Sequence, residues 1–401
     1  VALFYLADFA VADIADMLDI SRGATRKRLH DARLRLRGIL NDEEIQMAKD
    51  EFDSKRPSRD SAFTERVAAS MMAAVGGDAA AMRTLLAQDD SIANAAGDHP
   101  IWGGRPQPLH LAAERNHVDV ARALIANGAN VNGDNAGYDD WSPLMLAAHG
   151  GRLGLHPPRP EIVTLLLDAG AELDVFAAAV LDDTDRLAEC LRSSPDAALD
   201  AGPAGAFPLH FARSKAAVEL LLRHGGDPNA VCGWGTTPLE RAAFRGSAGN
   251  AVAEALMAGG AEPHANVLAC LGDIERLSKF LDENPLELET KRKVAPSIIG
   301  TPLHGAAANG ELATVQLLID RGADVNARAD NGQSPLHLCN SHLEVTKTLV
   351  DNGADPNARD GEHDNTPLGW ARFFIANLAQ DEPELPEVIA YLETVTGNEP
   401  S

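Results

Sequence analysis

A proline–leucine pair recurs along most of this chain, and this internal repeat constrains the fold more than any other feature. The successive prolines are separated by 35, 65, 30, 64, 33 and 32 residues. The two long gaps are about twice the others, so we predict that each hides one unit that lacks the pair. The pairs begin at Pro108, Pro143, Pro208, Pro238, Pro302, Pro335 and Pro367.

Each pair coincides with a signal for the start of a helix, and glycines downstream of most pairs are typical of helix ends. Proline fixes φ at the first helical position, and we expect Gly128, Gly170 and Gly322 to end the second helix of their units. A histidine follows the pair in several units, where we expect it to stabilise the turn into the helix. These histidines lie one per repeat, too far apart to share a metal ion. They are His110, His210, His304 and His337.

Three further segments resemble one another and lack the proline–leucine pair. In each, an aspartate is followed eight positions later by a leucine. The matching positions are Asp78 and Leu86, Asp183 and Leu191, and Asp273 and Leu281. We predict that these segments are repeats of the same kind and that the first of them caps an array of about ten units.

The best-formed units read QPLHLAAERNHVDVARALIANGANVN and TPLHGAAANGELATVQLLIDRGADVN. They resemble the ankyrin repeat, in which a β-hairpin finger precedes two antiparallel helices. The resemblance implies an all-α solenoid of about ten repeats with short β-hairpin fingers over residues 62–401. It also implies that a protein partner binds through the fingers or the groove of the array.

The first forty residues differ from this array in charge. Their net charge is +2, whereas residues 41–401 carry −26, and all seven basic residues of this head fall within residues 22–37. Val11–Leu18 shows a helical apolar pattern, a turn follows, and Ser21 is a good N-cap for a second, basic helix. We predict a helix-turn-helix over residues 1–40. The alternative is an ordinary amphipathic pair with a solvated basic face.

The amino-acid sequence of the head resembles region four of the sigma-70 family, of the extracytoplasmic-function type. The resemblance lies in Asp13-Ile14-Ala15-Asp16, Ile20-Ser21-x-Gly23 and Arg28-Leu29-His30-x-Ala32-Arg33. It implies that the second helix enters promoter DNA and that the head touches RNA polymerase. The implied DNA-binding residues are Arg22, Arg26, Lys27, Arg28, His30 and Arg33. Asp19 departs from the usual turn glycine, and Asp31 places an acid on the helix.

Residues 41–61 mix charges densely and contain Pro57, so we expect a short helix followed by a linker between the head and the array. Within the array, aromatic residues next to glycines mark the predicted finger tips. Exposed aromatics on loops are common anchors of protein interfaces. We therefore predict protein binding by these rings, with gap-filling between neighbouring fingers as the alternative. They are Trp102, Tyr138, Trp141 and Trp234.

Catalytic motifs do not stand out anywhere in the sequence, which contains no H-E-x-x-H, G-x-S-x-G or P-loop pattern. We predict neither an enzyme nor a bound metal or cofactor. The four widely spaced cysteines predict reduced thiols and a cytoplasmic location. No run of 18 apolar residues occurs, so we predict no membrane span.

Two functions follow as hypotheses. The first is a DNA-binding transcription regulator, whose array binds a protein or folds back, through its negative charge, to mask the basic head. The alternative is a protein-interaction scaffold with a vestigial helix-turn-helix, an interpretation that Asp19 and Asp31 keep open. An enzyme would require catalytic residues upstream of Val1, since we expect the chain to begin inside a larger protein.

Overall fold

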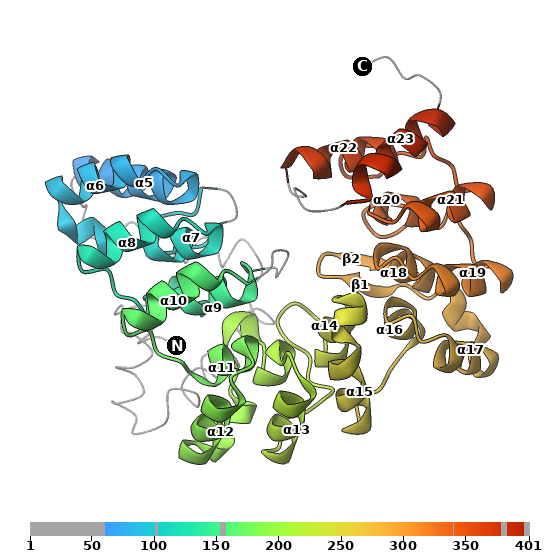
Figure 1. Cartoon of the computed structure of the whole chain (residues 1–401), viewed down its shortest axis with the longest axis horizontal. Helices are drawn as coiled ribbons and strands as arrows, with labels where there is room; N and C mark the ends of the chain where they lie inside the picture. Colours follow the sequence, from blue (N-terminus) through green and yellow to red (C-terminus); the bar gives the residue numbers. More distant parts are fainter. Residues whose placement is uncertain (1–60, 101–102, 153–157, 340, 378–382, 397–401) are drawn as a thin grey trace, which may run out of the picture. The chain divides into compact units, whose positions relative to one another are not determined.

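The computed structural model describes residues 61–100, 103–152, 158–339, 341–377 and 383–396. The predicted head, residues 1–40, and all but the last residue of the predicted linker lie outside these ranges. The chain divides into two compact units. The first extends to Asp227 and includes Cys232–Trp234, and the second contains Pro228–Val231 and continues from Gly235. Each unit is a stack of helix pairs (Figure 1).

The first unit consists of α-helices joined by short 3₁₀ segments. Its α-helices are α5 (Ser61–Gly76), α6 (Ala79–Gln88), α7 (Pro108–Arg115), α8 (Val118–Ala126), α9 (Pro143–His149), α10 (Pro160–Asp168), α11 (Val175–Leu181), α12 (Thr184–Ser193) and α13 (Lys215–Arg223). Its 3₁₀ segments are η1 (Asp90–Asn94), η2 (Ala136–Tyr138), η3 (Pro195–Leu199), η4 (Pro203–Gly205) and η5 (Pro208–Phe211).

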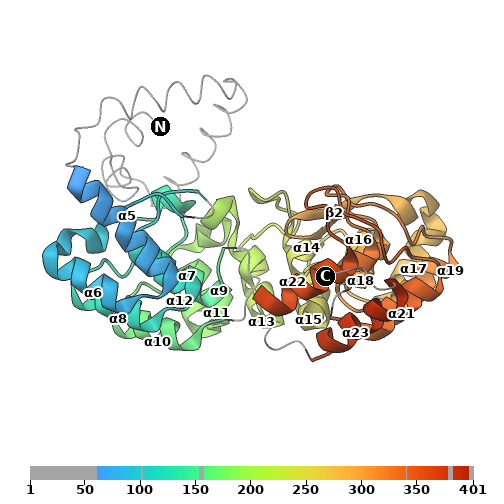
Figure 2. The ribbon, with the colours of Figure 1, turned by 90° about the horizontal axis from the view of Figure 1, so that it is seen from above.

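The second unit has the same organisation and adds one β-hairpin. Its helices are α14 (Pro238–Ala243), η6 (Gly246–Gly249), α15 (Asn250–Ala258), α16 (Ala265–Cys270), α17 (Ile274–Glu283), η7 (Pro285–Glu289), α18 (Pro302–Ala308), α19 (Leu312–Asp320), α20 (Pro335–Leu338), α21 (Leu343–Asp351), α22 (Pro367–Asn377) and α23 (Leu385–Thr396). Strands β1 (Arg292–Ala295) and β2 (Ile298–Gly300) pair antiparallel. Viewed from above, β2 lies at one edge of this unit and α21 and α23 lie at the opposite edge (Figure 2).

Small residues on the first helix of each pair allow the helices to pack closely. Ala112, Ala113, Ala306 and Ala307 are all fully buried. Leucines and valines of successive pairs fill the space between them, as in the core of the second unit, which includes Leu268, Leu277, Leu303, Val315 and Leu318. The core of each unit is therefore a continuous layer shared by neighbouring repeats.

The tag histidines stabilise the turn into the first helix, as the sequence predicts. The Nδ1 atom of His304 accepts a hydrogen bond from the Thr301 amide at 3.1 Å, and its Nε2 atom bonds the Gln333 carbonyl of the next repeat at 3.1 Å. The same amide-to-Nδ1 bond joins Gln107 to His110, Phe207 to His210 and Ser334 to His337. Each tag histidine thus caps its own helix, and His304 also holds the following repeat.

The predicted helix ends are also confirmed. Gly128, Gly170 and Gly322 follow the C-caps of α8, α10 and α19 with φ values of 81°, 90° and 89°. These values lie in the left-handed region, where a residue with a Cβ atom is strained. Glycine is therefore required at the point where the chain leaves each of these helices.

The three units without a tag begin their second helix at the aspartates that the sequence aligns. Asp78, Asp183 and Asp273 are the N-caps of α6, α12 and α17, with side chains that accept backbone hydrogen bonds from the first turn. Leu86, Leu191 and Leu281 are at most 3% exposed. These segments are helix pairs within the stack of their own unit, as predicted.

One of these caps provides a direct test of the alignment. Replacing Asp183 by alanine removes the acceptor of the Arg186 amide, 2.9 Å away. We expect the free energy of unfolding to fall by about 1 kcal/mol, measured by urea denaturation. Asp183→Asn is the matched control, because an asparagine oxygen can accept the same bond. An alanine variant as stable as the asparagine variant would show that the cap is not stabilising.

The link between successive pairs differs between tagged and untagged units. Six residues separate α10 from α11 and α15 from α16, whereas 14 to 19 residues precede each tagged first helix. A link of six residues is too short to fold out into a finger and return. We call the longer links fingers, and the pairs α11–α12 and α16–α17 fingerless repeats.

The expectation of β-hairpin fingers throughout the array is wrong for most of the described fingers. Within the described ranges, strand pairing occurs in one finger, β1–β2. Other fingers contain residues in the left-handed region, such as Asp139, Asp140 and Ala204, and this conformation interrupts strand pairing. These fingers are held instead by side-chain bonds, such as Gln107 Oε1 accepting the Asp134 amide at 2.9 Å.

Candidate functional site

Backbone hydrogen bonds link consecutive fingers within each unit. In the first unit the Arg105 amide donates to the Gly137 carbonyl at 2.7 Å, and the Gly233 amide donates to the Ala204 carbonyl at 3.0 Å. In the second unit the Asp330 amide donates to the Ile299 carbonyl at 2.9 Å. A further bond joins Gly361 to Asn331. The fingers of each unit therefore form a layer with its own hydrogen-bonding pattern.

An aromatic cluster fills this layer above the fingerless repeat of the first unit. The Trp141 ring lies 6.0 Å from both Phe211 and Trp234, measured between ring centroids, and Phe176 of α11 lies 6.1 Å from Phe211. Phe176 belongs to the helix that lacks a finger, whereas Trp141 and Trp234 come from fingers on either side in sequence. Rings from two fingers thus meet beside α11, which has no finger of its own.

The prediction of exposed interface anchors is therefore wrong for two of the four rings. Trp141 is 0% exposed among aromatic rings, and Tyr138 is 1% exposed beside α7. Trp234 is half-buried, so binding by this ring stays a prediction. Trp102 lies outside the described residues. The gap-filling alternative describes Trp141 and Tyr138.

Tyr138 belongs to a polar cluster at the end of α7. Its hydroxyl donates to Glu114 Oε2 at 2.6 Å, its ring stacks on His99 with centroids 5.9 Å apart, and the Arg152 guanidinium lies 4.6 Å from the ring centroid. Burial, followed by the charge of Glu114, raises the pKa of Tyr138 far above its usual range. Burial also lowers the pKa of His99. The cluster is therefore a structural contact between finger and helix.

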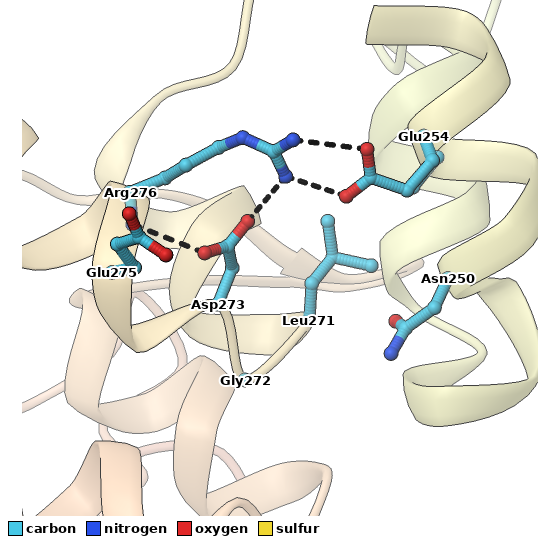
Figure 3. Close-up of a pocket in the computed structure, with 8 residues that line it drawn as sticks. Asn250, Glu254, Leu271, Gly272, Asp273, Glu275 and Arg276 are labelled. Atoms are coloured by element: carbon cyan, nitrogen blue, oxygen red, sulfur yellow. Dashed lines mark hydrogen bonds and ion pairs between the residues drawn. The ribbon is translucent and has the colours of Figure 1, made fainter.

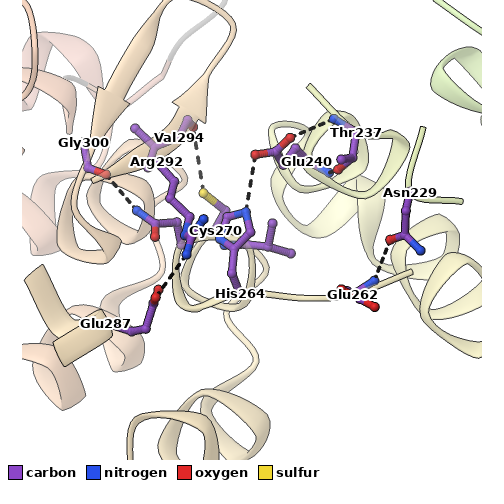
Figure 4. A network of polar contacts seen from close by, with 12 residues as sticks. Asn229, Thr237, Glu240, Glu262, His264, Cys270, Glu287, Arg292, Val294 and Gly300 are labelled. Atoms are coloured by element: carbon purple, nitrogen blue, oxygen red, sulfur yellow. Dashed lines mark hydrogen bonds and ion pairs between the residues drawn. The ribbon is translucent and has the colours of Figure 1, made fainter. Parts of the chain in front are cut away.

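In the second unit, polar side chains lie near the fingerless repeat α16–α17 (Figure 4). Glu240 occupies the tag position where other repeats have histidine, and its Oε2 atom accepts the Thr237 amide at 2.7 Å. Its Oε1 atom lies 3.3 Å from His264 Nε2. Burial alone would raise the pKa of Glu240, but the bonds from His264 and Thr237 outweigh it and hold this pKa below its usual value.

The hairpin β1–β2 is a basic finger in an acidic chain of net charge −24. Lys291 and Arg292 are exposed, and Arg292 pairs with Glu287 Oε1 at 3.0 Å. The Lys293 ammonium donates to the Pro296 carbonyl at 3.2 Å. Strand β1 also packs on α16, where the Cys270 thiol donates to the Val294 carbonyl at 3.8 Å (Figure 4).

A second aromatic group, separate from the four rings predicted to bind a protein, lies on α22. Trp370 is half-buried and donates to Asp360 Oδ2 at 2.6 Å, whereas Phe373 is 45% exposed and its ring centroid lies 5.6 Å from that of Trp370. The sequence does carry a signal for this group, since the tag helix reads PLGWARFFIAN and contains three aromatic residues.

A cleft of about 430 Å³ lies between α15 and α17 (Figure 3). The Arg276 guanidinium bonds both oxygens of Glu254, with the Nη2–Oε2 pair at 2.9 Å, and also bonds Asp273 Oδ2 at 2.6 Å. Three of the charged groups that line the cleft, Arg276, Glu254 and Asp273, are thus paired with one another.

Cys270 and Cys339 are buried within the repeats of the described part of the chain. Burial raises the pKa of the Cys270 and Cys339 thiols to about 12, which makes them poor nucleophiles. Within the described ranges, no three histidine, cysteine or acidic side chains are placed to hold a metal ion. Among the same residues, no helix combines the length and apolar character needed to cross a membrane.

The predicted DNA-binding residues all lie outside the described residues. They are Arg22, Arg26, Lys27, Arg28, His30 and Arg33. The structure therefore brings none of them to a described site, and their role stays a prediction.

Parts of several other proteins are similar to parts of this chain. The chain is 23% identical over 219 residues to the human transient receptor potential cation channel subfamily A member 1, an alignment that covers 55% of this chain and 15% of the channel. It is 30% identical to the chicken nuclear factor NF-kappa-B p105 subunit, over 51% of this chain and 22% of that protein. Bovine mitochondrial disaggregase is 30% identical, over 61% of this chain and 36% of the disaggregase.

These alignments cover only a minor part of each relative, about a seventh of the channel and about a third of the disaggregase. The family model for ankyrin repeats in three copies matches residues 70–177 and 268–360, and the single ankyrin-repeat model matches residues 204–232. All matched ranges lie C-terminal to the predicted head. Together with the stacked helix pairs and their tags, these matches show that the chain belongs to the ankyrin-repeat family.

Proposed function

We propose that this chain is a non-enzymatic scaffold of the cytoplasm whose ankyrin array, residues 62–401, binds a protein partner. The observation that supports this most directly is that many polar side chains of the described repeats form hydrogen bonds within the chain. Tag histidines, capping aspartates, Glu240 and Arg276 all bind neighbours in the same chain. The surfaces left for function are the outer faces of the fingers and helices, which suit macromolecular partners.

The test starts from the full chain. Candidates are isolated by affinity purification, and each complex is then reconstituted from purified components and measured by analytical ultracentrifugation. We expect at least one partner to form a stoichiometric complex with the full chain. The proposal fails when no candidate re-forms a complex from purified components.

A second function is supported by a specific observation, the seven basic residues within residues 22–37 and the motifs around them. We infer that the head binds promoter DNA and the RNA polymerase, and that the acidic array regulates this binding by masking the head. Changing Arg26 and Lys27 to glutamate in the full chain should abolish a gel shift with promoter DNA, because both contacts become repulsive. If neither the wild-type chain nor residues 1–61 shift DNA, only the scaffold function is left.

Masking of the head by the array predicts a difference in salt dependence between the full chain and residues 1–61. Binding of the full chain to DNA should strengthen, relative to residues 1–61, as salt screens the attraction between head and array. Equal affinities with equal salt dependence for the two proteins would contradict masking and leave DNA binding intact.

A further inference from the structure

The outer edge of strand β1 is open within the described part of the chain. Strand β2 pairs with β1 on one side and with Asp330 of the next finger on the other. The outer edge of β1 therefore faces the preceding repeat, α16–α17, which has no finger. The Cys270 bond to the Val294 carbonyl confirms that β1 lies against α16.

The register of the hairpin identifies which backbone groups point outward. Ile299 directs its amide to Asp330 Oδ1 at 3.0 Å and accepts the Asp330 amide on its carbonyl, so both groups point away from β1. Ile299 is opposite Lys293. In an antiparallel ladder, opposite residues of such a pair both direct their backbone groups outward. The Lys293 amide and carbonyl thus point to the open edge, and no other described segment pairs with them through its backbone.

In the first unit, the space above the fingerless helix α11 corresponds to the space beside β1 above α16. Above its fingerless helix α11, the Ala204 amide donates to the Asp139 carbonyl at 2.8 Å, so the finger layer is continuous. Ala204 adopts φ +52° to reach this position, and the ring of Phe176 fills the space beneath. In the first unit the chain itself closes the gap that the missing finger leaves.

The second unit lacks these closing elements among its described residues. Asn266 occupies the position of Phe176, since each is the second residue of its helix. Asn266 is fully buried and donates through Nδ2 to the Gly300 carbonyl at 2.7 Å. Its Oδ1 atom is buried, and no group in the described ranges donates to it. This gap is therefore bordered by polar groups rather than by aromatic rings.

The positive charge beside the open edge of β1 favours an acidic partner. Lys291, Arg292 and Lys293 are consecutive basic residues along the edge, and Lys291 is exposed with no ion pair in the described part of the chain. Arg292 retains a partner, Glu287, whose charge a ligand carboxylate could replace. A segment that lies along this edge meets positive charge, in contrast with the acidic chain as a whole.

We propose that the outer edge of β1 binds an extended, acidic segment of a partner protein, which pairs with the Lys293 backbone and continues the finger layer over α16. Exposed strand edges are templates for such pairing, and carboxylates of the segment are attracted by Lys291 and Arg292. This inference rests on the proposed protein-binding function and specifies one docking site for it.

The test uses two variants of the full chain at one position. Lys293→Pro removes the outward amide hydrogen, and proline is tolerated on strand edges where the amide faces outward. Lys293→Gln is the matched control, because it removes the charge and keeps the amide. The probe is a library of short peptides in which glutamate or aspartate alternates with valine or threonine, and a second library carries lysine in place of the acids.

Binding is measured by fluorescence anisotropy and by hydrogen exchange of the Lys293 amide. We expect acidic peptides to bind, basic peptides not to bind, and the Lys293 amide of the wild-type chain to exchange more slowly in the complex. Lys293→Pro should weaken binding about tenfold, since a net hydrogen bond contributes on the order of 1 kcal/mol. Lys293→Gln should weaken it about two- to threefold, the effect of one exposed charge.

Three results would overturn the docking site. They are an acidic library without binders, unchanged exchange of the Lys293 amide in a complex, and equal affinity of the proline variant and the wild type. The exchange measurement uses the wild-type chain, so it decides even where the proline variant folds poorly. A reconstituted partner whose affinity is unaffected by Lys293→Pro would overturn this site while leaving the protein-binding function standing.

Discussion

Replacing Trp141 by alanine is expected to lower the free energy of unfolding of the first unit by about 3–5 kcal/mol. The side chain is fully buried, and its ring contacts His149, Phe211 and Trp234. Neighbouring rings relax only in part around the cavity that alanine would leave, so the cost includes a cavity contribution. Urea denaturation followed by circular dichroism measures the loss.

The matched control is Trp141→Phe. It keeps a ring in the cluster and removes the indole Nε1 hydrogen, which no group in the described ranges accepts. A buried donor without an acceptor is itself unfavourable, so we expect this variant to lose only about 1–2 kcal/mol. Trp234→Ala should also cost less than Trp141→Ala, because Trp234 is half-buried.

Hydrogen exchange tests whether Trp141→Ala destabilises the first unit and leaves the second unit unchanged. Amides of α9, α11 and η5 should exchange faster in Trp141→Ala, whereas amides of α18 and α19 should keep their wild-type rates. A loss below about 1 kcal/mol, or a loss no larger than that of Trp234→Ala, would show that the cluster does not replace the missing finger.

Local rules of helix formation explain what could be predicted from the sequence. The caps at Asp78, Asp183 and Asp273 and the glycine at Gly322 depend on residues within one turn of the helix. A repeat then multiplies each local signal, so the helix pairs could be predicted even where the proline–leucine tag is missing.

The finger layer depends instead on which fingers are missing. Trp141 stands among glycine and aspartate residues that suggest an exposed loop, and its burial follows from the short link before α11, one repeat further along the chain. The open edge of β1 arises in the same way from the short link before α16. Link lengths could have indicated both places, but the residues Phe176 and Asn266 decide whether the gap is filled or open.

Acidification is expected to destabilise the array before most carboxylates titrate. Burial lowers the pKa of His304 to about 4 and also lowers the pKa of His110 and His337. The unfolded chain protonates these histidines near pH 6.5, so between pH 6.5 and about 4 it binds more protons than the folded chain. Their stability contribution is therefore complete above pH 6.5 and is lost as the pH falls toward 4.

Burial is the main reason why the folded state resists protonation of His304, whereas the bond to Gln333 acts in the opposite direction. The Nδ1 atom of His304 accepts the Thr301 amide, and its Nε2 atom bonds the Gln333 carbonyl. A second ring proton would have to replace the Nδ1 acceptor inside a fully buried site. The displacement of this pKa corresponds to about 3 kcal/mol for His304 alone, which is a large fraction of the stability of a domain.

Two groups of carboxylates modify this profile. Burial raises the pKa of Glu289 and Glu311, so their protonation favours the folded state as the pH falls and offsets part of the histidine effect. The lowered pKa of Glu240 acts in the opposite direction, because its contribution is present above pH 4.5 and is lost below it. The unfolded histidines titrate near pH 6.5, above the usual range of glutamate, so the histidine effect is the first to act as the pH falls.

Urea denaturation of the full chain at several pH values between 7 and 4.5 tests this profile. His304→Gln is the informative variant, since it removes the titrating ring and its Nδ1 acceptor. It should be less stable than the wild type at pH 7, yet its free energy of unfolding should change less with pH between 6.5 and 5. The slope separates the two effects, because a purely structural loss lowers stability equally at every pH. Parallel profiles for the two proteins would show that His304 is not the group whose protonation destabilises the fold.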